Sequence, residues 1–115
     1  MRTLLVLILA IPFNAYSLTL HTELECLGKK VAPVITVPEG TWAEIAQDDL
    51  HLRLWARGTA DDGVKIKTEI ARVAGTEIEI LGTPSVMTKW GSPAQVEVMK
   101  EDGSLVYRLK VTPSL

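Results

Sequence analysis

Two similar segments, each about fifty residues long, follow one another along this chain. They share a proline, a Gly-x-x-Ala turn and an aliphatic residue at one constant spacing, in the pairs Pro33 and Pro84, Gly40 and Gly91, Ala43 and Ala94, and Ile45 and Val96. Matching runs flank them, because residues 21–24 resemble 67–70 and residues 50–54 resemble 105–109. A duplicated unit predicts two halves of similar structure, which we place at approximately residues 18–58 and 63–115.

Both halves show the alternation of apolar and polar residues that is typical of β-strands. In residues 64–70, Val64, Ile66 and Ile70 alternate with charged side chains, and the same pattern recurs in residues 50–54, 76–80 and 94–98. Because successive side chains of a strand point to opposite faces, each segment predicts a strand with one buried face. Residues 42–47 have the alternative of a helical turn, but Pro93 in the matching segment favours a strand or an irregular edge in both copies.

Turn residues separate these segments, and the pairs Asp62-Gly63 and Asp102-Gly103 are typical of tight hairpins. The sequence therefore predicts an all-β fold of about eight antiparallel strands, packed as a sandwich or as a small closed barrel. We expect each half to supply one sheet of about four strands, so that the two sheets cover each other's apolar faces.

Residues 1–17 have the three parts of an export signal: Arg2, an apolar run at residues 4–11, and the small residues Ala15 and Ser17 before a cleavage site. The apolar run is shorter than the roughly 20 residues of a transmembrane helix. We predict a signal peptide cleaved after Ser17, a mature single domain of residues 18–115 without an integral membrane segment, and a periplasmic or secreted location. A buried N-terminal element and a retained anchor are the alternatives.

The charge and cysteine content limit the possible partners and cross-links. With 12 basic and 14 acidic residues the chain is mildly acidic, which gives no electrostatic basis for binding nucleic acid. Cys26 is the only cysteine, so no intrachain disulfide can form and the hydrophobic core must hold the fold. Because Cys26 alternates in phase with Leu20 and Leu24, we predict that it is buried; an interchain disulfide is the alternative.

Few residues are suited to catalysis. His21 and His51 fall on the polar phase of their strands, where solvent exposure is expected, and no third ligand stands at zinc-site spacing. The acidic pairs in the turns lack the ligand spacing of a calcium loop, and no phosphate-binding loop or nucleophile elbow is present. We therefore predict a protein that is not an enzyme, with no catalytic or metal-binding residues and no cofactor. A metal site would require His21, His51 and acidic residues to converge.

One polar strand face carries a tryptophan among cationic residues. Trp55 shares its predicted face with His51, Arg53 and Arg57. An indole beside guanidinium groups can form a binding hot spot for a protein or a glycan, although it can also simply cover the rim of a sandwich. These four residues are our candidate partner-binding residues. Trp42 and Trp90 flank the duplicated turns, where we expect each to pack against the other half.

The second half also resembles a known family. Three segments are similar to the secretin homology region: residues 83–88 (Thr-Pro-Ser-Val-Met-Thr), residues 91–98 (Gly-Ser-Pro-Ala-Gln-Val-Glu-Val) and residues 105–115 (Leu-Val-Tyr-Arg-Leu-Lys-Val-Thr-Pro-Ser-Leu). Secretins are the outer-membrane pore proteins of type II and type III secretion systems and of type IV pili. The similarity covers under a third of the chain, and the first half has Ala56-Arg57-Gly58 in place of Val-Thr-Pro.

Secretins are several times longer than this chain and carry periplasmic ring domains. The resemblance therefore implies a small exported relative of that module, an accessory or interaction domain rather than a channel, and it assigns no site residue.

The sequence thus predicts an exported, non-catalytic β module that binds another protein, as an accessory of an envelope, secretion or pilus assembly. The alternative is an exported inhibitor of a protease or a cell-wall lytic enzyme, which would present the turns at residues 60–63 and 101–103. The oligomeric state does not follow from the sequence.

Overall fold

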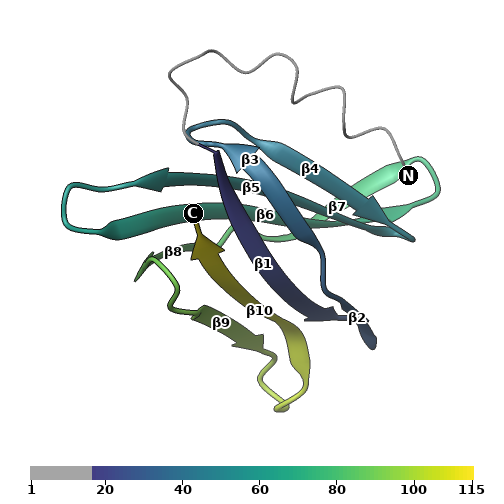
Figure 1. The fold of residues 1–115 in the computed structure, drawn as a ribbon. Helices are drawn as coiled ribbons and strands as arrows, with labels where there is room; N and C mark the ends of the chain where they lie inside the picture. The colour runs from purple at the N-terminus through teal and green to yellow at the C-terminus, as the bar shows by residue number, and fades with distance from the viewer. Residues whose placement is uncertain (1–16) are drawn as a thin grey trace.

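The computed structural model describes residues 17–115, which form two antiparallel β-sheets packed against each other (Figure 1). Sheet A contains β1 (Ser17–Cys26), β2 (Lys29–Val31), β3 (Val34–Pro38), β9 (Ala94–Met99) and β10 (Leu105–Ser114). Sheet B contains β4 (Ala43–Gln47), β5 (Leu50–Gly58), β6 (Gly63–Ala74), β7 (Glu77–Gly82) and β8 (Ser85–Lys89). The predicted all-β sandwich is confirmed, whereas the closed barrel is wrong, because both sheets end in edge strands.

The predicted signal peptide lies outside the described residues, apart from Ser17, which begins β1. Residues 17–115 contain no helix with the length and hydropathy needed to cross a membrane. The segment at residues 43–47 forms a strand, as the comparison with Pro93 indicated, and not a helical turn.

Each sheet is built around two long central strands. In sheet A, β1 pairs with β10 on one side and with β2 and then β3 on the other. In sheet B, β6 pairs with β5 on one side and with β7 and then β8 on the other. Figure 1 shows β1 and β10 lying across β5 and β6.

Two prolines explain why residues 17–115 form ten strands and not about eight. Pro33 separates β2 from β3, and Pro84 separates β7 from β8. Proline lacks the N–H that a ladder requires, so the strand is interrupted at that residue. Its carbonyl still accepts a hydrogen bond from the long strand, 3.0 Å from the amide of Thr22 to Pro33 and 2.9 Å from that of Thr68 to Pro84.

The two halves have the same strand order, but neither forms a sheet of its own. In the first half β1, β2 and β3 lie in sheet A while β4 and β5 join sheet B; in the second half β6, β7 and β8 lie in sheet B while β9 and β10 join sheet A. The expectation of one sheet per half is therefore wrong.

The physical reason lies in the duplicated glycine turn. Gly40 and Gly91 adopt φ of 77° and 81°, a conformation that favours glycine, and there the chain leaves one sheet for the other. Their amides donate to the carbonyls of Ala56 and Pro113, at 2.8 and 2.7 Å.

The pairing register also corrects the sequence alignment of residues 50–54 in β5 with residues 105–109 in β10. Ala43 pairs with Leu54 and Ala94 pairs with Val111, so that Leu54 corresponds to Val111 and not to Leu109. This shift of two residues is accommodated by the β9–β10 connection, which is longer than the β4–β5 turn, and by a bulge between Leu105 and Tyr107.

The inward-facing residues of the long strands fill the space between the sheets. Cys26 is fully buried among them, as its phase predicted, and Tyr107 is almost fully buried. Burial of these apolar side chains is the main stabilising term for a fold without a disulfide. The largest buried aliphatic side chains are Leu18, Leu20, Leu24, Val37, Leu54, Val64, Ile66, Ile70, Leu109 and Val111.

Candidate functional site

The outer face of sheet B carries all four residues that the sequence marked for partner binding. Along β5, even-numbered residues such as Leu52 and Leu54 point into the core, which leaves His51, Arg53, Trp55 and Arg57 on the outside. The structure therefore brings the four together on one surface, although their neighbours on β4 and β6 give each a different role.

Trp55 lies next to a lysine from the adjacent strand. Lys67 pairs with it across β5 and β6, and the Lys67 ammonium stands 4.5 Å from the centroid of the indole ring. A cation at this distance from the ring face is attracted by the π-electrons, so the indole is held half-buried at the surface in a defined orientation.

Arg53 is engaged on both sides. Its guanidinium donates to Glu69 of β6 at 3.2 Å and lies 4.8 Å from the ring centroid of Trp42, which precedes β4. Trp42 is 41% exposed and its ring lies under Arg53 of its own half, so its packing against the other half stays a prediction. Trp90, by contrast, packs against the core. The Arg53 charge is thus largely matched within the chain.

Among the four candidate residues on the outer face of β5, His51 lies at the end opposite to Arg57. Its Nδ1 lies 3.4 Å from a carboxylate oxygen of Glu44, and its cross-strand neighbours are Ala46 and Ala71. The imidazole therefore borders a less charged part of the sheet, and it adds little to the cationic surface around Trp55.

Positive charge accumulates towards the β5–β6 turn. Arg57 pairs with Lys65, and Lys65 pairs on its other side with Met87 of β8, which is 65% exposed. Within residues 17–115, Arg57, Lys65 and Lys67 form no ion pair. We call this surface the Trp55 patch and define it as Trp55, Arg57, Lys65, Lys67 and Met87.

Three members of the Trp55 patch were missed in the sequence, namely Lys65, Lys67 and Met87. The alternation places Lys65 and Lys67 on the polar face of their strand. Only the pairing register shows that this polar face adjoins Trp55 and Arg57.

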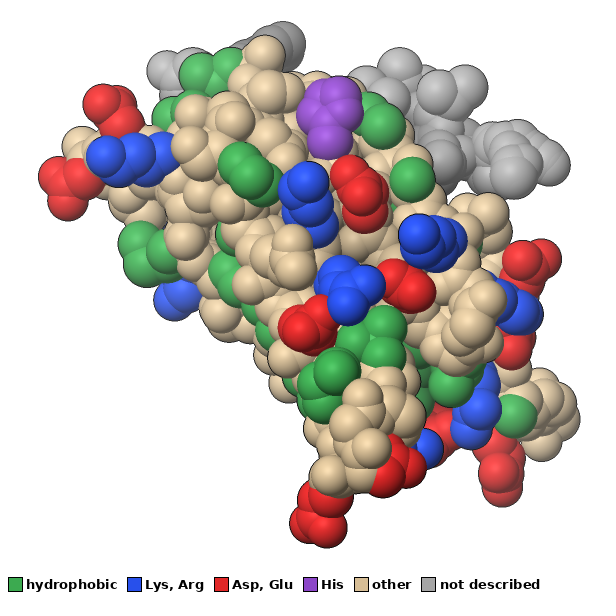
Figure 2. All heavy atoms as spheres, turned by 90° about the horizontal axis from the view of Figure 1, so that it is seen from below, with side chains coloured by type: hydrophobic (Ala, Val, Ile, Leu, Met, Phe, Trp, Pro, Cys, Tyr) green, Lys and Arg blue, Asp and Glu red, His purple; other side chains and the backbone are tan. Residues whose placement is uncertain are grey.

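The outer face of sheet A has a different electrostatic character. Arg108 is held by Glu25 at 2.8 Å and by Glu97 at 2.6 Å, and the two carboxylates raise its pKa above the ordinary arginine value. Figure 2 shows acidic and basic side chains interspersed on the side of the molecule where β9 and β10 lie. The charges on this face are therefore largely compensated locally.

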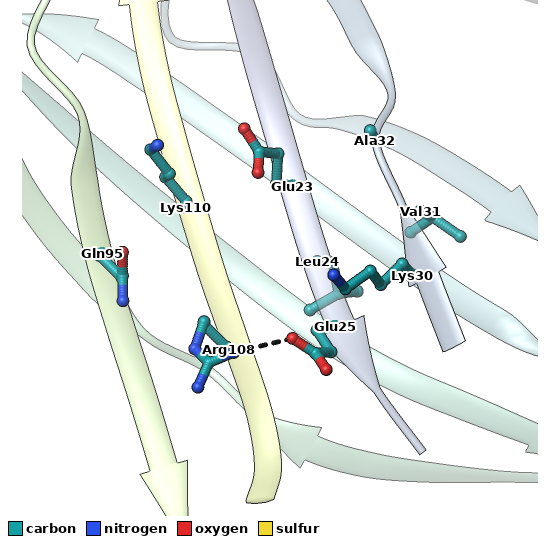
Figure 3. Close-up of a pocket in the computed structure, with 9 residues that line it drawn as sticks. All are labelled: Glu23, Leu24, Glu25, Lys30, Val31, Ala32, Gln95, Arg108 and Lys110. Atoms are coloured by element: carbon teal, nitrogen blue, oxygen red, sulfur yellow. Dashed lines mark hydrogen bonds and ion pairs between the residues drawn. The ribbon is translucent and has the colours of Figure 1, made fainter. Parts of the chain in front are cut away.

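A shallow groove of about 370 Å³ runs across the same face, beside the break between β2 and β3 (Figure 3). Leu24, Val31 and Ala32 form part of its wall, and its polar lining consists of Glu23, Glu25, Lys30, Gln95, Arg108 and Lys110. Acidic and basic side chains alternate in it, and Figure 3 shows Arg108 reaching across to Glu25. It offers no cluster of one charge that would select a ligand.

The residues with catalytic potential do not converge. His21 lies on the outer face of sheet A and His51 on that of sheet B, while Cys26 points into the core, where burial raises the pKa of its thiol. Among the described residues no three His, Cys, Asp or Glu side chains are grouped so as to hold a metal ion. The convergence that a metal site or a thiol–imidazole pair would need is not formed.

The chain matches no protein-family model, and no curated protein sequence and no solved structure shows significant similarity to it. The similarity of residues 83–115 to the secretin homology region therefore stays a prediction. Any functional assignment has to be argued from the surfaces described above.

Proposed function

We propose that this protein is an exported, non-catalytic β module that binds another protein through the Trp55 patch. The observation that carries the proposal is the position of Trp55, a half-buried indole beside Lys67, next to Arg57 and Lys65, which form no ion pair with any described residue. Tryptophan and arginine are the residue types most enriched at binding hot spots.

The charge of the patch indicates the character of the partner. The chain as a whole has a net charge of −2, yet Arg57, Lys65 and Lys67 make this surface locally basic. An acidic partner surface would meet both the cations and the exposed Met87 side chain, and such complementarity favours fast and specific association.

The sheet beneath the patch supports rigid presentation. β5 and β6 pair continuously from Leu50 to Gly58, and the residues on their inner faces are buried in the core. Since four of the patch side chains stand on the central strands β5 and β6 and Met87 stands on β8, and none on a loop, little conformational entropy is lost when a partner docks.

The export signal and the resemblance to the secretin homology region favour a partner in the envelope, in a secretion or pilus assembly. In this proposal the mature protein acts in the periplasm or outside the cell, as an accessory that docks and does no chemistry.

The proposal is tested with the mature protein immobilised and exposed to an envelope extract of the producing cell. We expect one or more acidic proteins that are retained by the wild type, released by salt, and lost with Trp55→Ala and with Arg57→Glu. Lys110→Glu is the matched control, because it reverses a charge on the outer face of sheet A and should leave retention unchanged. Equal retention by the wild type and by both patch variants would rule out this surface.

The inhibitor alternative has one supporting observation, in the β9–β10 turn. The Asp102 carboxylate accepts hydrogen bonds from the amide and the hydroxyl of Ser104, at 2.8 and 2.7 Å, and Lys100 also bonds to Ser104 across the turn. An inhibitor needs such a fixed loop. A panel of proteases and cell-wall lytic enzymes distinguishes the two functions, since only the inhibitor predicts reduced hydrolysis that Asp102→Ala restores.

A further inference from the structure

Among the described residues 17–115, no strand pairs with the second edge of strand β7. Strand β7 lies at the end of sheet B, paired with β6 through Ile70–Ala74 and with no other described strand. On its outer face Ile78 and Ile80 are 65% and 51% exposed, although the alternation in the sequence predicts that they are buried. The reason is the irregularity in the β6–β7 register between Ile70 and Ala71, which sets Ile80 beside Ala71 and so turns the apolar phase of β7 to the outer face. The β6–β7 hairpin also extends beyond the part of sheet B that sheet A covers (Figure 1).

The corresponding strand of the first half, β2, shows how such an edge is usually protected. It has three residues, two of them lysines, and Lys29 is held by Asp49 at 2.6 Å. Short length and lysine are common means of preventing a sheet edge from pairing with another chain. β7 has six residues and contains neither lysine nor proline, so the two halves differ at this edge.

The apolar residues on β7 continue onto β6. Ile78 pairs with Val73 and Ile80 pairs with Ala71, which lies beside His51 of β5. A strand added along β7 would therefore set its outward side chains against an existing apolar strip.

The opposite side of β7 is acidic. Glu77 and Glu79 alternate with the isoleucines and are both exposed; Glu79 is bound by Arg72, whereas Glu77 has no ion pair within residues 17–115. These charges disfavour self-pairing, since an antiparallel β7–β7 contact centred on Ile78 or on Glu79 sets glutamate opposite glutamate. They favour a strand that carries basic residues at the same positions.

We propose that the β7 edge binds an extended segment of another protein in which aliphatic residues alternate with lysine or arginine. The backbone of that segment would extend sheet B by one strand, its aliphatic side chains would contact Ile78 and Ile80, and its basic side chains would contact Glu77 and Glu79. This inference goes beyond the Trp55 patch, because it uses other strands and a partner of opposite charge, so either surface can fail without the other.

The test uses a fluorescent, end-capped Lys-Val-Lys-Val-Lys-Val peptide and the mature protein, with affinity measured by anisotropy. We expect the Lys-Val peptide to bind, and the Glu-Val-Glu-Val-Glu-Val peptide to bind about tenfold more weakly than the Lys-Val peptide. Methylation of alternate backbone nitrogens of the Lys-Val peptide should abolish binding, because strand addition depends on backbone hydrogen bonds.

Two variants of similar exposure distinguish the edge from nonspecific attraction. Ile78→Lys, at a side chain that is 65% exposed, should abolish binding of the Lys-Val peptide, while Val34→Lys, at a side chain that is 59% exposed on β3 of sheet A, should leave it unchanged. Glu77→Lys should weaken binding of the Lys-Val peptide and strengthen binding of the Glu-Val peptide. Thermal unfolding of each variant checks that the fold is retained.

Three results would overturn the proposal. The first is no binding of the Lys-Val peptide, and the second is binding that survives both backbone methylation and Ile78→Lys. The third is a dimer in sedimentation velocity that Ile78→Lys dissociates, because a second copy of the chain would then occupy the edge.

Discussion

The side chain of Tyr107 on β10 lies directly against the backbone of Gly82 on β7. A Cβ atom placed on Gly82 would lie 2.6 Å from the tyrosine hydroxyl oxygen and 2.6 Å from its Cε2, which is closer than van der Waals contact allows. In the first half, the pairing register assigns Val31 to the position of Gly82 and Leu50 to that of Tyr107. The duplicated unit thus places a large side chain opposite a glycine in one copy and two aliphatic residues in the other.

We predict that Gly82→Ala destabilises the fold by about 1–3 kcal/mol, because the added methyl group forces the almost fully buried Tyr107 ring to move. Urea denaturation of the wild type and the variant measures this difference. An unchanged midpoint would show that the ring can shift at no cost.

A compensating pair separates this contact from a general effect of substitution. Tyr107→Leu alone should also destabilise, by about 2–4 kcal/mol, since it leaves a cavity over Gly82. The double variant Gly82→Val with Tyr107→Leu copies the residues of the first half. We expect the double variant to be at least about 1 kcal/mol more stable than the summed effects of the single variants Gly82→Val and Tyr107→Leu predict.

The sequence predicts the strands well and their distribution between the sheets poorly. Alternation along residues 50–54 and 64–70 identifies β5 and β6, because these strands are buried on one face over most of their length. The Gly40 and Gly91 turns were recognised as a repeat, yet a turn does not show which sheet the chain enters next. That choice depends on pairing between the halves, β5 with β6 and above all β1 with β10, which lie at opposite ends of the described chain.

The candidate site was predicted in part for the same reason. Trp55 and Arg57 lie on one strand, so their shared face follows from alternation alone. Lys67 and Met87 reach that surface from other strands, through a register that composition does not encode. The exposure of Ile78 likewise depends on the irregularity in the β6–β7 register, which turns the apolar phase of β7 outward, and no local pattern contains that information.

Two buried threonines at equivalent positions give a second stability prediction. Thr22 and Thr68 are 1% and 2% exposed, and neither hydroxyl has a hydrogen-bond partner within residues 17–115. Valine has nearly the same shape without the unsatisfied hydroxyl. We therefore expect Thr22→Val and Thr68→Val each to raise the free energy of unfolding by about 1 kcal/mol.

Chemical denaturation measures both threonine variants, with Thr112→Val on the outer face of β10 as the control that should change stability little. A loss of stability in both core variants would mean that an ordered water molecule satisfies the hydroxyls.

The single cysteine gives a prediction about reactivity. Cys26 is fully buried, and burial raises the pKa of its thiol above the ordinary 9.0, so the native protein holds little thiolate and exposes none. With an aromatic disulfide reagent at pH 8, we expect modification at least about 100-fold slower in the native state than in urea. A cysteine introduced by Thr112→Cys should react at the unfolded rate in both conditions.

The raised pKa of Cys26 also has a consequence at alkaline pH. The unfolded chain ionises this thiol above pH 9.0 while the folded chain resists ionisation, so the contribution of Cys26 to stability declines as the pH rises through that value. Cys26→Ala should lack this part of the alkaline decline. An identical decline in the variant would show that Cys26 is not its source.

The Lys29–Asp49 ion pair links β2 of sheet A to the β4–β5 turn of sheet B and gives the last prediction, for acid pH. The hydrogen bond from Lys29 lowers the pKa of Asp49 below 3.8, so protonation of Asp49 is less favourable in the folded state than in the unfolded state. The contribution of this pair is therefore present above pH 3.8 and is lost as the pH falls through the lower folded value.

Asp49→Asn should lower the melting temperature by a few degrees at most near neutral pH, because the pair is exposed, and the difference from the wild type should vanish in strong acid. High salt should also reduce this difference in melting temperature, because it screens the ion pair. Asp61→Asn in the β5–β6 turn, whose carboxylate makes no ion pair among the described residues, is the control. If Asp49→Asn and Asp61→Asn follow the same pH profile, the two sheets are held together at this corner by the core alone.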